Sequence, residues 1–374
     1  MRVVIAKKLL STVGGSEVQA RALGRALAAR GHEVTLVGMR PAWRRPGIPD
    51  HAVAGSREAV FTHDGGMRVL YLPSRWGRAG AAIEGILPTS LADGAMLDSA
   101  LAGAQIVHVI AREWAGPLER AARRAGAAYV ETPLAHPGQR WSGGGRADAA
   151  RYRRADAVIA LTEWEAAWYR DRGATRVHVT GVGPVIGDLP DVTAESATIL
   201  FVGRKERYKG YSSLRAAAPL VWRERRDARF VAIGQRPWSG AFDRQAIDPR
   251  WTELGVVPEA VKAEAYARAT IFAMPSDHET FGHTYLEAWA ARRPVIAGDI
   301  PALREVVRSG IDGIHSRNEP RAVAGAILRL LSDPEGARRM GESGHARLLE
   351  RFTWDRIAER TEAAYASARE PVRR

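Results

Sequence analysis

Residues 271–299, IFAMPSDHETFGHTYLEAWAARRPVIAGD, hold the pattern that decides the fold. The apolar run at 271–274 is typical of a buried parallel strand. A helix is predicted from about Gly282, with the Arg-Arg pair at 292–293 in its last turn, where cations suit the helix dipole. A proline ends this helix, and a second apolar run follows at 295–297. The stretch therefore predicts a strand-loop-helix-strand unit of a parallel α/β sheet.

Two carboxylates flank the predicted start of this helix. Glu279 lies in the loop before it, and Glu287 lies inside it, roughly 7–8 Å along the axis at about 1.5 Å per residue. A helix N-terminus exposes unpaired N–H groups and partial positive charge, so a phosphate could bind between the two carboxylates. Glu279 could then accept the hydroxyls of a sugar, and Glu287 those of a ribose. A neighbour of the helix cap and a solvated helix residue are the alternative roles, and the pair alone leaves them open.

The segment SDHETFGHTYLEAWAARRPVIA, at 276–297, resembles the E-x7-E signature of a known enzyme family. That family is the retaining GT-B glycosyltransferases of family 4, of the glycogen-synthase and sucrose-synthase type. The resemblance implies that Glu279 takes part in catalysis by positioning the transferred sugar. It also implies donor contacts from Phe281, Gly282, His283 and Glu287. One departure is Arg293, where the family often has glycine.

A second basic and glycine-rich segment, GRKERYKG at 203–210, follows a strand predicted at 199–202. Two cations flanked by glycines at the carboxyl end of a strand favour an anion site, although a solvated basic turn is the alternative. The segment resembles the G-R-x4-K-G element of the same family. The resemblance implies a donor contact at Gly203 and catalytic contacts from Arg204 and Lys209 to the diphosphate.

A third segment of the second half, LGVVP at 254–258, resembles the part of these enzymes whose backbone lies against the nucleotide base. The resemblance implies that Val257 contacts the donor.

The N-terminal half begins with a predicted strand at 2–7 and a Gly-Gly pair at the start of a helix. Such glycines let a ligand approach the backbone, although a simple tight turn is the alternative. The pair resembles the GG-x-E opening of the same family, which implies donor contacts from Gly14 and Gly15. His136 follows a strand predicted at 129–134, and its position resembles that of the family's cleft histidine, which contacts the transferred sugar. A structural histidine is the alternative.

Strands alternate with helices along the chain, which predicts an α/β protein with two doubly wound parallel sheets. The resemblance implies a GT-B fold, in which two Rossmann-like domains face each other across a cleft. We expect an acceptor-side domain at 1–185 and a donor-binding domain at 186–351. A last helix at 352–374 is expected to pack back on the first domain. A hinge is predicted at 181–191, which holds three glycines and two prolines.

The resemblance is weakest at 40–105, where 41–57 and 74–88 are predicted as loops. We expect these loops to choose the acceptor.

The resemblance implies a hexosyltransferase that moves a sugar from a nucleotide-diphosphate sugar, UDP- or GDP-linked, to a hydroxyl acceptor. A cell-envelope glycan or glycolipid and a secondary metabolite are the acceptor classes left open. No Asp-x-Asp motif occurs, so we expect no metal and no cofactor beyond the donor. A nucleotide-sugar epimerase or a phosphorylase of the same fold is the alternative. A dehydrogenase is disfavoured because the first turn lacks G-x-G-x-x-G, and a nucleic-acid-binding protein is the weakest candidate.

Composition sets further bounds on the 374 residues. There is no cysteine, which excludes disulfides and thiolate metal sites. No apolar run approaches the roughly 18–20 residues that span a bilayer, so we expect a soluble cytoplasmic protein, with peripheral association to the inner face of the membrane left open. The net charge is +13, and residues 1–185 hold 25 Lys and Arg against 16 Asp and Glu. An anionic acceptor, an anionic membrane surface or nucleic acid would suit this excess, but GC-rich codons, which favour Arg and Ala, explain it equally well. The oligomeric state is left open.

Overall fold

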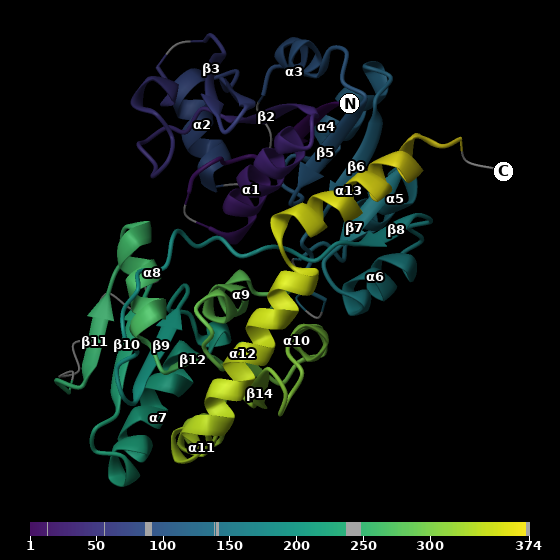
Figure 1. Ribbon diagram of the computed structural model, residues 1–374. Coiled ribbons are helices and arrows are strands. Elements are labelled where there is room, and N and C mark those ends of the chain that lie inside the picture. Colours follow the sequence, from purple (N-terminus) through teal and green to yellow (C-terminus); the bar gives the residue numbers. More distant parts are fainter. Residues whose placement is uncertain are drawn as a thin grey trace. The chain divides into compact units, whose positions relative to one another are not determined.

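The computed structural model describes residues 1–12, 14–55, 57–86, 92–137, 139, 142–236 and 248–371 (Figure 1). The chain divides into two compact units. Unit 1 comprises Met1–Val182 and the chain from Trp354 onward, and unit 2 comprises Gly183–Thr353. No helix in the described ranges is both long enough and apolar enough to cross a membrane.

Unit 1 is built on one sheet with the strand order β3-β4-β2-β1-β5-β6-β7-β8 in the described chain. Only the β3–β4 pair is antiparallel among its described pairings. The strands are β1 (Arg2–Ala6), β2 (Glu33–Met39), β3 (Val60–Asp64), β4 (Met67–Leu72), β5 (Ile106–Ile110), β6 (Ala128–Thr132), β7 (Ala157–Ala160) and β8 (Val177–Val179). The helices are α1 (Gly15–Ala29), α2 (Gly77–Ile86), α3 (Gly94–Leu101), α4 (Ala115–Arg124), α5 (Arg146–Arg154), α6 (Glu163–Arg170) and α13 (Trp354–Arg369).

Successive side chains of β1 point to opposite faces of this sheet, and both faces are buried. Val3 and Ile5 belong to a core shared with α1 and α13, which lie side by side in Figure 1. Val4 and Ala6 point into a second core, which includes side chains of α3 and α4. A strand with apolar residues on both faces is what a doubly wound parallel sheet requires.

Unit 2 has a fully parallel sheet with the order β11-β10-β9-β12-β13-β14 in the part described. Its strands are β9 (Thr198–Val202), β10 (Arg229–Ile233), β11 (Trp251–Leu254), β12 (Ile271–Met274), β13 (Val295–Gly298) and β14 (Gly313–Ser316). Its helices are α7 (Tyr211–Glu224), α8 (Glu259–Arg268), α9 (His283–Ala290), α10 (Pro301–Val306), α11 (Pro320–Ser332) and α12 (Pro334–Arg351). The strand predicted at 271–274 is confirmed with its predicted limits.

One prediction at 41–105 is wrong, and one strand there was not predicted. Residues 74–88 were predicted as a loop, but Gly77–Ile86 form α2. This helix contains three glycines, which lower helix propensity, and packing of Ala81 into the core offsets that cost. The edge strand β3 was not predicted, because only short-range antiparallel pairing with β4 defines it.

The predicted place of the Arg-Arg pair is also wrong. α9 ends at Ala290, and Arg292 has a left-handed backbone with φ 57°, so neither arginine lies in its last turn. Arg293 instead donates hydrogen bonds to the carbonyl oxygens of Tyr266 (3.3 Å) and Ala267 (2.7 Å). These carbonyls belong to the last turn of α8, so the cation stabilises the C-terminus of a different helix.

A buried histidine joins α13 to the sheet of unit 1. Nδ1 of His108, on β5, lies 2.8 Å from the hydroxyl of Tyr365 on α13. Its Nε2 lies 2.7 Å from Oγ1 of Thr132 at the end of β6. A neutral imidazole can therefore make both hydrogen bonds, donating from one ring nitrogen and accepting at the other.

We expect low pH to weaken the contact that His108 makes between α13 and the sheet. Burial lowers the pKa of His108 from 6.5 to about 3, so the unfolded chain takes up a proton that the folded unit rejects. The stability that the neutral ring contributes is complete above pH 6.5 and is lost as the pH falls from 6.5 towards 3. Hydrogen exchange in β5 and β6, corrected for intrinsic rates, should show less protection at about pH 5 than at about pH 7.

The variant His108→Asn should lose much of this pH dependence, whatever its absolute stability. His63→Asn in β3, where the side chain is exposed, is the control and should keep the wild-type response. An equal response in His108→Asn and wild type would show that another group causes it.

Candidate functional site

The sheet of unit 2 reverses its winding direction between β9 and β12. These strands are neighbours, although about 70 residues separate them in the chain, and β10 and β13 lie on their outer sides. The loops that follow β9 and β12, residues 203–210 and 275–282, therefore leave the same edge of the sheet. Such a switch point is where open α/β sheets bind ligands.

The two loops are fastened together by backbone contacts. Gly210 has φ 78°, and a Cβ placed there would come within 2.7 Å of the carbonyl oxygen of Pro275. The N–H of Asp277 and the hydroxyl of Ser276 both donate to the carbonyl oxygen of Tyr208, at 2.7 and 3.0 Å. The glycine at 210 is thus required for close approach, and the loops form one rigid surface.

The side chains of this surface combine cations with a carboxylate. Lys209 forms an ion pair with Glu279, which is buried. Arg204 keeps 62% of its side chain exposed, 3.2 Å from Glu206. It also donates to the hydroxyl of Tyr208. The structure therefore brings Arg204, Lys209 and Glu279 to one place, with the guanidinium facing solvent.

Tyr208 was missed by the sequence analysis, although it lies inside the quoted G-R-x4-K-G element. Its ring centre is 5.7 Å from the guanidinium carbon of Arg204 and 5.3 Å from Nζ of Lys209. Burial raises the pKa of Tyr208 to about 12, so it stays a neutral hydroxyl. The tyrosine thus orients both cations.

Lys205 shows why its neighbour Arg204 faces outward. Lys205 is buried, and its Nζ lies 2.6 Å from Oε1 of Glu253 in β11. Glu253 also accepts from the hydroxyl of Tyr211 at 2.8 Å and from the indole of Trp251 at 2.7 Å. Desolvation lowers the pKa of Lys205, and the pair holds the loop while exposing Arg204.

Gly203 and Val257 lie at the same edge as this loop. The N–H of Gly203 donates to the carbonyl oxygen of Ile233, and a Cβ on Gly234 would come within 2.0 Å of the Gly203 carbonyl oxygen. Val257 is half-buried in the connection between β11 and α8. Both are backbone positions at strand ends rather than reactive groups.

The helix predicted from about Gly282 is α9, and its N-terminus belongs to the second loop. Gly282 is its N-cap with φ 89° and supplies no side-chain cap. A Cβ on Gly282 would come within 2.5 Å of the Tyr285 ring, so a larger residue is excluded. The first N–H groups of α9 therefore receive no hydrogen bond from a capping side chain.

Phe281 and His283 border that N-terminus and both pack inward. The ring of Phe281 contacts that of Phe352, with centres 5.3 Å apart. Nδ1 of His283 lies 2.9 Å from the carbonyl oxygen of Gly183, and burial lowers the pKa of the ring. A neutral His283 that donates from Nδ1 to this carbonyl fits the geometry.

Glu287 is not a solvated helix residue, so that alternative is wrong. Its side chain is buried, and it accepts a hydrogen bond from the Tyr266 hydroxyl at 2.9 Å. Nζ of Lys262 lies 3.2 Å away, and Lys262 also contacts Glu259 at 2.9 Å. Burial raises the pKa of Glu287, against the effect of Lys262. Lys262 and Tyr266 were not identified from the sequence, because no local pattern marks their pairing with Glu287.

The predicted residues of unit 1 lie at the carboxyl edge of its own sheet. Gly14 is the N-cap of α1 with φ 120°, and a Cβ there would come within 2.4 Å of the Glu17 carboxylate. Gly15 is the first residue of that helix and is exposed. His136 follows β6, is half-buried, and its backbone N–H donates to Oγ of Ser142 at 2.7 Å.

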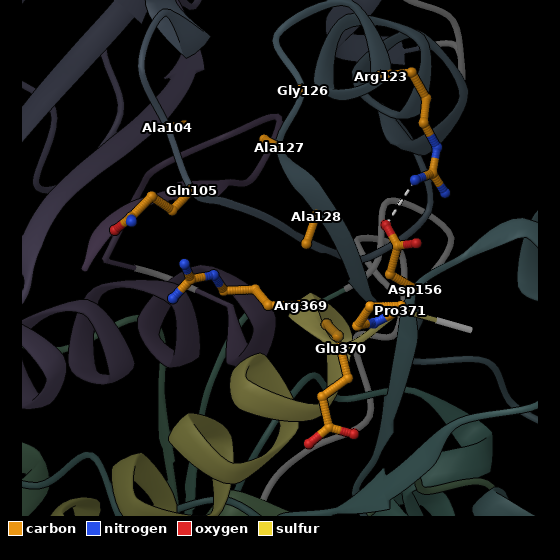
Figure 2. A pocket seen from close by; sticks show the side chains of 11 residues that line it. Ala104, Gln105, Arg123, Gly126, Ala127, Ala128, Asp156, Arg369, Glu370 and Pro371 are labelled. Carbon is orange, nitrogen blue, oxygen red and sulfur yellow. Dashed lines mark hydrogen bonds and ion pairs between the residues drawn. The ribbon is translucent and has the colours of Figure 1, made fainter. Parts of the chain in front are cut away.

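A hollow of about 560 Å³ in unit 1 lies at the opposite edge of the sheet (Figure 2). Gln105, Ala128 and Asp156 line it at the amino ends of the strands, with Arg369 and Glu370 at the end of α13. No predicted site residue is among its lining residues, so it is separate from the candidate site. Across the described chain, no three His, Asp or Glu side chains are grouped so that they could hold a metal ion.

Two family models match the chain, one in each half. The model for a glycosyl transferase 4-like domain matches residues 14–184, and the model for glycosyl transferases group 1 matches residues 196–333. Together they span most of both units.

Curated relatives agree with these models. A D-inositol 3-phosphate glycosyltransferase from Thermobifida fusca is 30% identical over 294 residues, which cover 69% of this chain and 66% of that protein. The protein of the same name from Thermobispora bispora is 29% identical over 195 residues, or 48% of this chain and 45% of that protein. The chain thus matches about half to two thirds of the length of these relatives.

Among solved structures, sucrose-phosphate synthase from Thermosynechococcus elongatus has a TM-score of 0.78 at 21% identity, with 98% of both chains covered. This likeness shows the fold, which is GT-B with two Rossmann-like domains. On the matches to both halves of the chain, the protein belongs to the glycosyltransferases in which a glycosyl transferase 4-like domain precedes a group 1 domain.

Proposed function

We propose that the protein transfers a hexose from a nucleotide-diphosphate sugar, UDP- or GDP-linked, to a hydroxyl of an acceptor, with retention and without a metal. The observation that carries this proposal is the grouping of Arg204, Lys209 and Glu279 at the β9–β12 switch point. An exposed cation, a second cation and a carboxylate within two joined loops suit a ligand that has both phosphate and hydroxyl groups.

Charge on the leaving diphosphate grows as the glycosidic bond breaks, so its stabilisation is the main chemical task. Arg204 presents a planar fork of N–H groups to solvent, which matches phosphate oxygens. Lys209 adds a point charge, and the uncapped N-terminus of α9 adds backbone N–H donors. These three groups would do electrostatically what a divalent cation does in metal-dependent transferases.

Glu279 is better suited to holding the sugar than to attacking it. Its carboxylate is fixed by Lys209 and is buried, which limits its movement towards an anomeric carbon. In the proposed reaction the bond from the anomeric carbon to the diphosphate oxygen breaks, and the acceptor oxygen bonds to the same face. The acceptor proton passes to an oxygen of the departing diphosphate, so no protein nucleophile is needed.

The acceptor could be a small molecule or a glycolipid. The charge excess of residues 1–185 supports peripheral contact with the inner face of a membrane in the glycolipid case. An epimerase or phosphorylase is not carried further, because both matching family models describe glycosyl transferases. The relatives named above carry D-inositol 3-phosphate in their names.

Metal independence can be checked by chelation. We expect release of nucleoside diphosphate from UDP-glucose or GDP-mannose, with an acceptor panel present, to be unchanged by EDTA, because the protein's own cations stabilise the leaving group. Turnover before and after EDTA is measured on the same preparation. Complete loss that Mn²⁺ restores would refute metal independence.

The role of Glu287 is tested by its effect on the donor. Glu287→Ala should raise the KM for the nucleotide sugar about tenfold, with a smaller effect on kcat, if the carboxylate only holds ribose hydroxyls. Glu259→Ala is the matched control, because Glu259 also contacts Lys262 but is exposed. A donor KM that stays at the wild-type value in Glu287→Ala would contradict the ribose role.

A further inference from the structure

The sheet of unit 1 has its own switch point, between β1 and β5. β2 lies on the far side of β1 and β6 on the far side of β5, so the chain winds in opposite directions from this pair. The residues that follow β1 and β5 leave the same edge and form a second place at which a ligand could bind.

A charged pair bridges this switch point. Nζ of Lys7, which follows β1, lies 3.3 Å from both carboxylate oxygens of Glu113, which follows β5. The side chain of Lys7 is 4% exposed, whereas that of Glu113 is 36% exposed. The lysine is therefore a buried support, and the carboxylate is the member that faces solvent.

The backbone at this edge is strained. Among the described residues, only Ala111, Leu134, Ala197 and Arg292 have a positive φ without being glycine. Two of these four directly border the edge, since Ala111 follows β5 with φ 63° and Leu134 follows β6 with φ 53°. Non-glycine residues in this conformation are energetically costly and cluster at functional sites. The two strained residues follow adjacent strands, one near Glu113 and one near His136. This favours a ligand site at the edge over a purely structural role for the Lys7–Glu113 ion pair.

The two cations that adjoin Lys7 and Glu113 in the sequence also have acidic groups nearby. Lys8 is buried near Glu84 and Glu113, and burial lowers its pKa. Arg112 lies 3.6 Å from Asp148 on α5, so it points away from Glu113 despite being its neighbour in the chain. Lys7, Lys8 and Arg112 thus each have a carboxylate nearby.

The two switch points thus offer opposite charges to a ligand. In unit 2 the exposed member is Arg204, at 62%, with Glu206 at 28%, and it suits an anion. In unit 1 the exposed member is Glu113, and it suits a donor of hydrogen bonds. A phosphate placed beside Glu113 would be repelled by the negative charge of its carboxylate. Lys7, the cation of this ion pair, is buried and does not offset that repulsion at the surface.

We propose that Glu113, held in place by Lys7, is an acceptor subsite that binds hydroxyls of a neutral polyol and discriminates against phosphorylated acceptors. The proposal rests on the transferase function proposed above and assigns its acceptor class. It separates this chain from the relatives named for D-inositol 3-phosphate. Glu113 is assigned a role in acceptor binding and specificity and not the role of a catalytic base, because the proton of the acceptor hydroxyl goes to the diphosphate.

The experiment compares the binding of neutral compounds with that of their phosphates, using the 374-residue chain. The probes are myo-inositol and its 3-phosphate, glucose and glucose phosphate, and glycerol and glycerol phosphate. Binding is measured by saturation-transfer NMR in the presence of UDP or GDP, and turnover by release of nucleoside diphosphate. We expect at least one neutral compound to bind about 10–100-fold more tightly than its phosphate, the range of a hydrogen bond to a charged group.

The variants assign that preference to one side chain. Glu113→Gln should weaken binding of the neutral compound about tenfold or more and reduce the preference, whereas Arg112→Gln should leave both unchanged. If Glu113→Gln does not fold, because Lys7 is left buried without its partner, the double variant with Lys7→Met removes both charges and should behave in the same way.

The proposal is overturned by tighter binding of a phosphate, by no effect of Glu113→Gln, by a loss confined to Arg112→Gln, or by no binding of any neutral compound in the panel. Failure of the transferase function is distinguished by the nucleotide. If the protein binds no nucleoside diphosphate, the proposed reaction is refuted. If it binds the nucleotide normally but Glu113→Gln leaves binding of the neutral compound unchanged, only the subsite is refuted.

Discussion

Backbone contact between the loops that follow β9 and β12 is the constraint on which the proposed donor chemistry depends. Gly210 passes so close to Pro275 that no side chain fits at that position, and the Tyr208 carbonyl accepts hydrogen bonds from both Ser276 and Asp277. Because the loops are locked in this way, Lys209 on one can pair with Glu279 on the other. Fixed dipoles and charges need no reorganisation when charge develops on a leaving group, which is the main advantage of an enzyme site over water.

Burial decides which member of each charged pair is available to a ligand. Lys205 and Lys7 are buried beneath their loops, where their carboxylate partners hold them, and they act as supports. Arg204 and Glu113 remain exposed and are the groups that a substrate can reach. The formal charge of a segment therefore predicts its ligand less well than the exposure of each partner does. The same reasoning underlies the proposed anion site in unit 2 and the proposed hydroxyl site in unit 1.

The sequence predicted the parts of the fold that leave a local pattern. Buried parallel strands are continuous apolar runs, so the strand at 271–274 was found with its limits, and Gly282 marked the start of α9 correctly. The helix α2 could not be predicted, because its glycines favour a loop and only core packing stabilises it. The partners of Glu287 were also beyond prediction, since Lys262 and Tyr266 meet it only once α8 and α9 are packed. Side-chain pairing between separate elements depends on the fold, whereas strands and turns are encoded locally.

The central claim is that Arg204 belongs to a nucleoside diphosphate site, and ligand-induced stabilisation tests it most directly. Thermal unfolding is measured with UDP, GDP, ADP and TDP in the absence of metal, for wild type, Arg204→Ala and the control Arg207→Ala, an exposed cation of the same loop. Binding to the native state raises the unfolding temperature by mass action. The account predicts a rise with one of these nucleotides in wild type and Arg207→Ala that is lost in Arg204→Ala. No rise with any nucleotide, or an undiminished rise in Arg204→Ala, would contradict it.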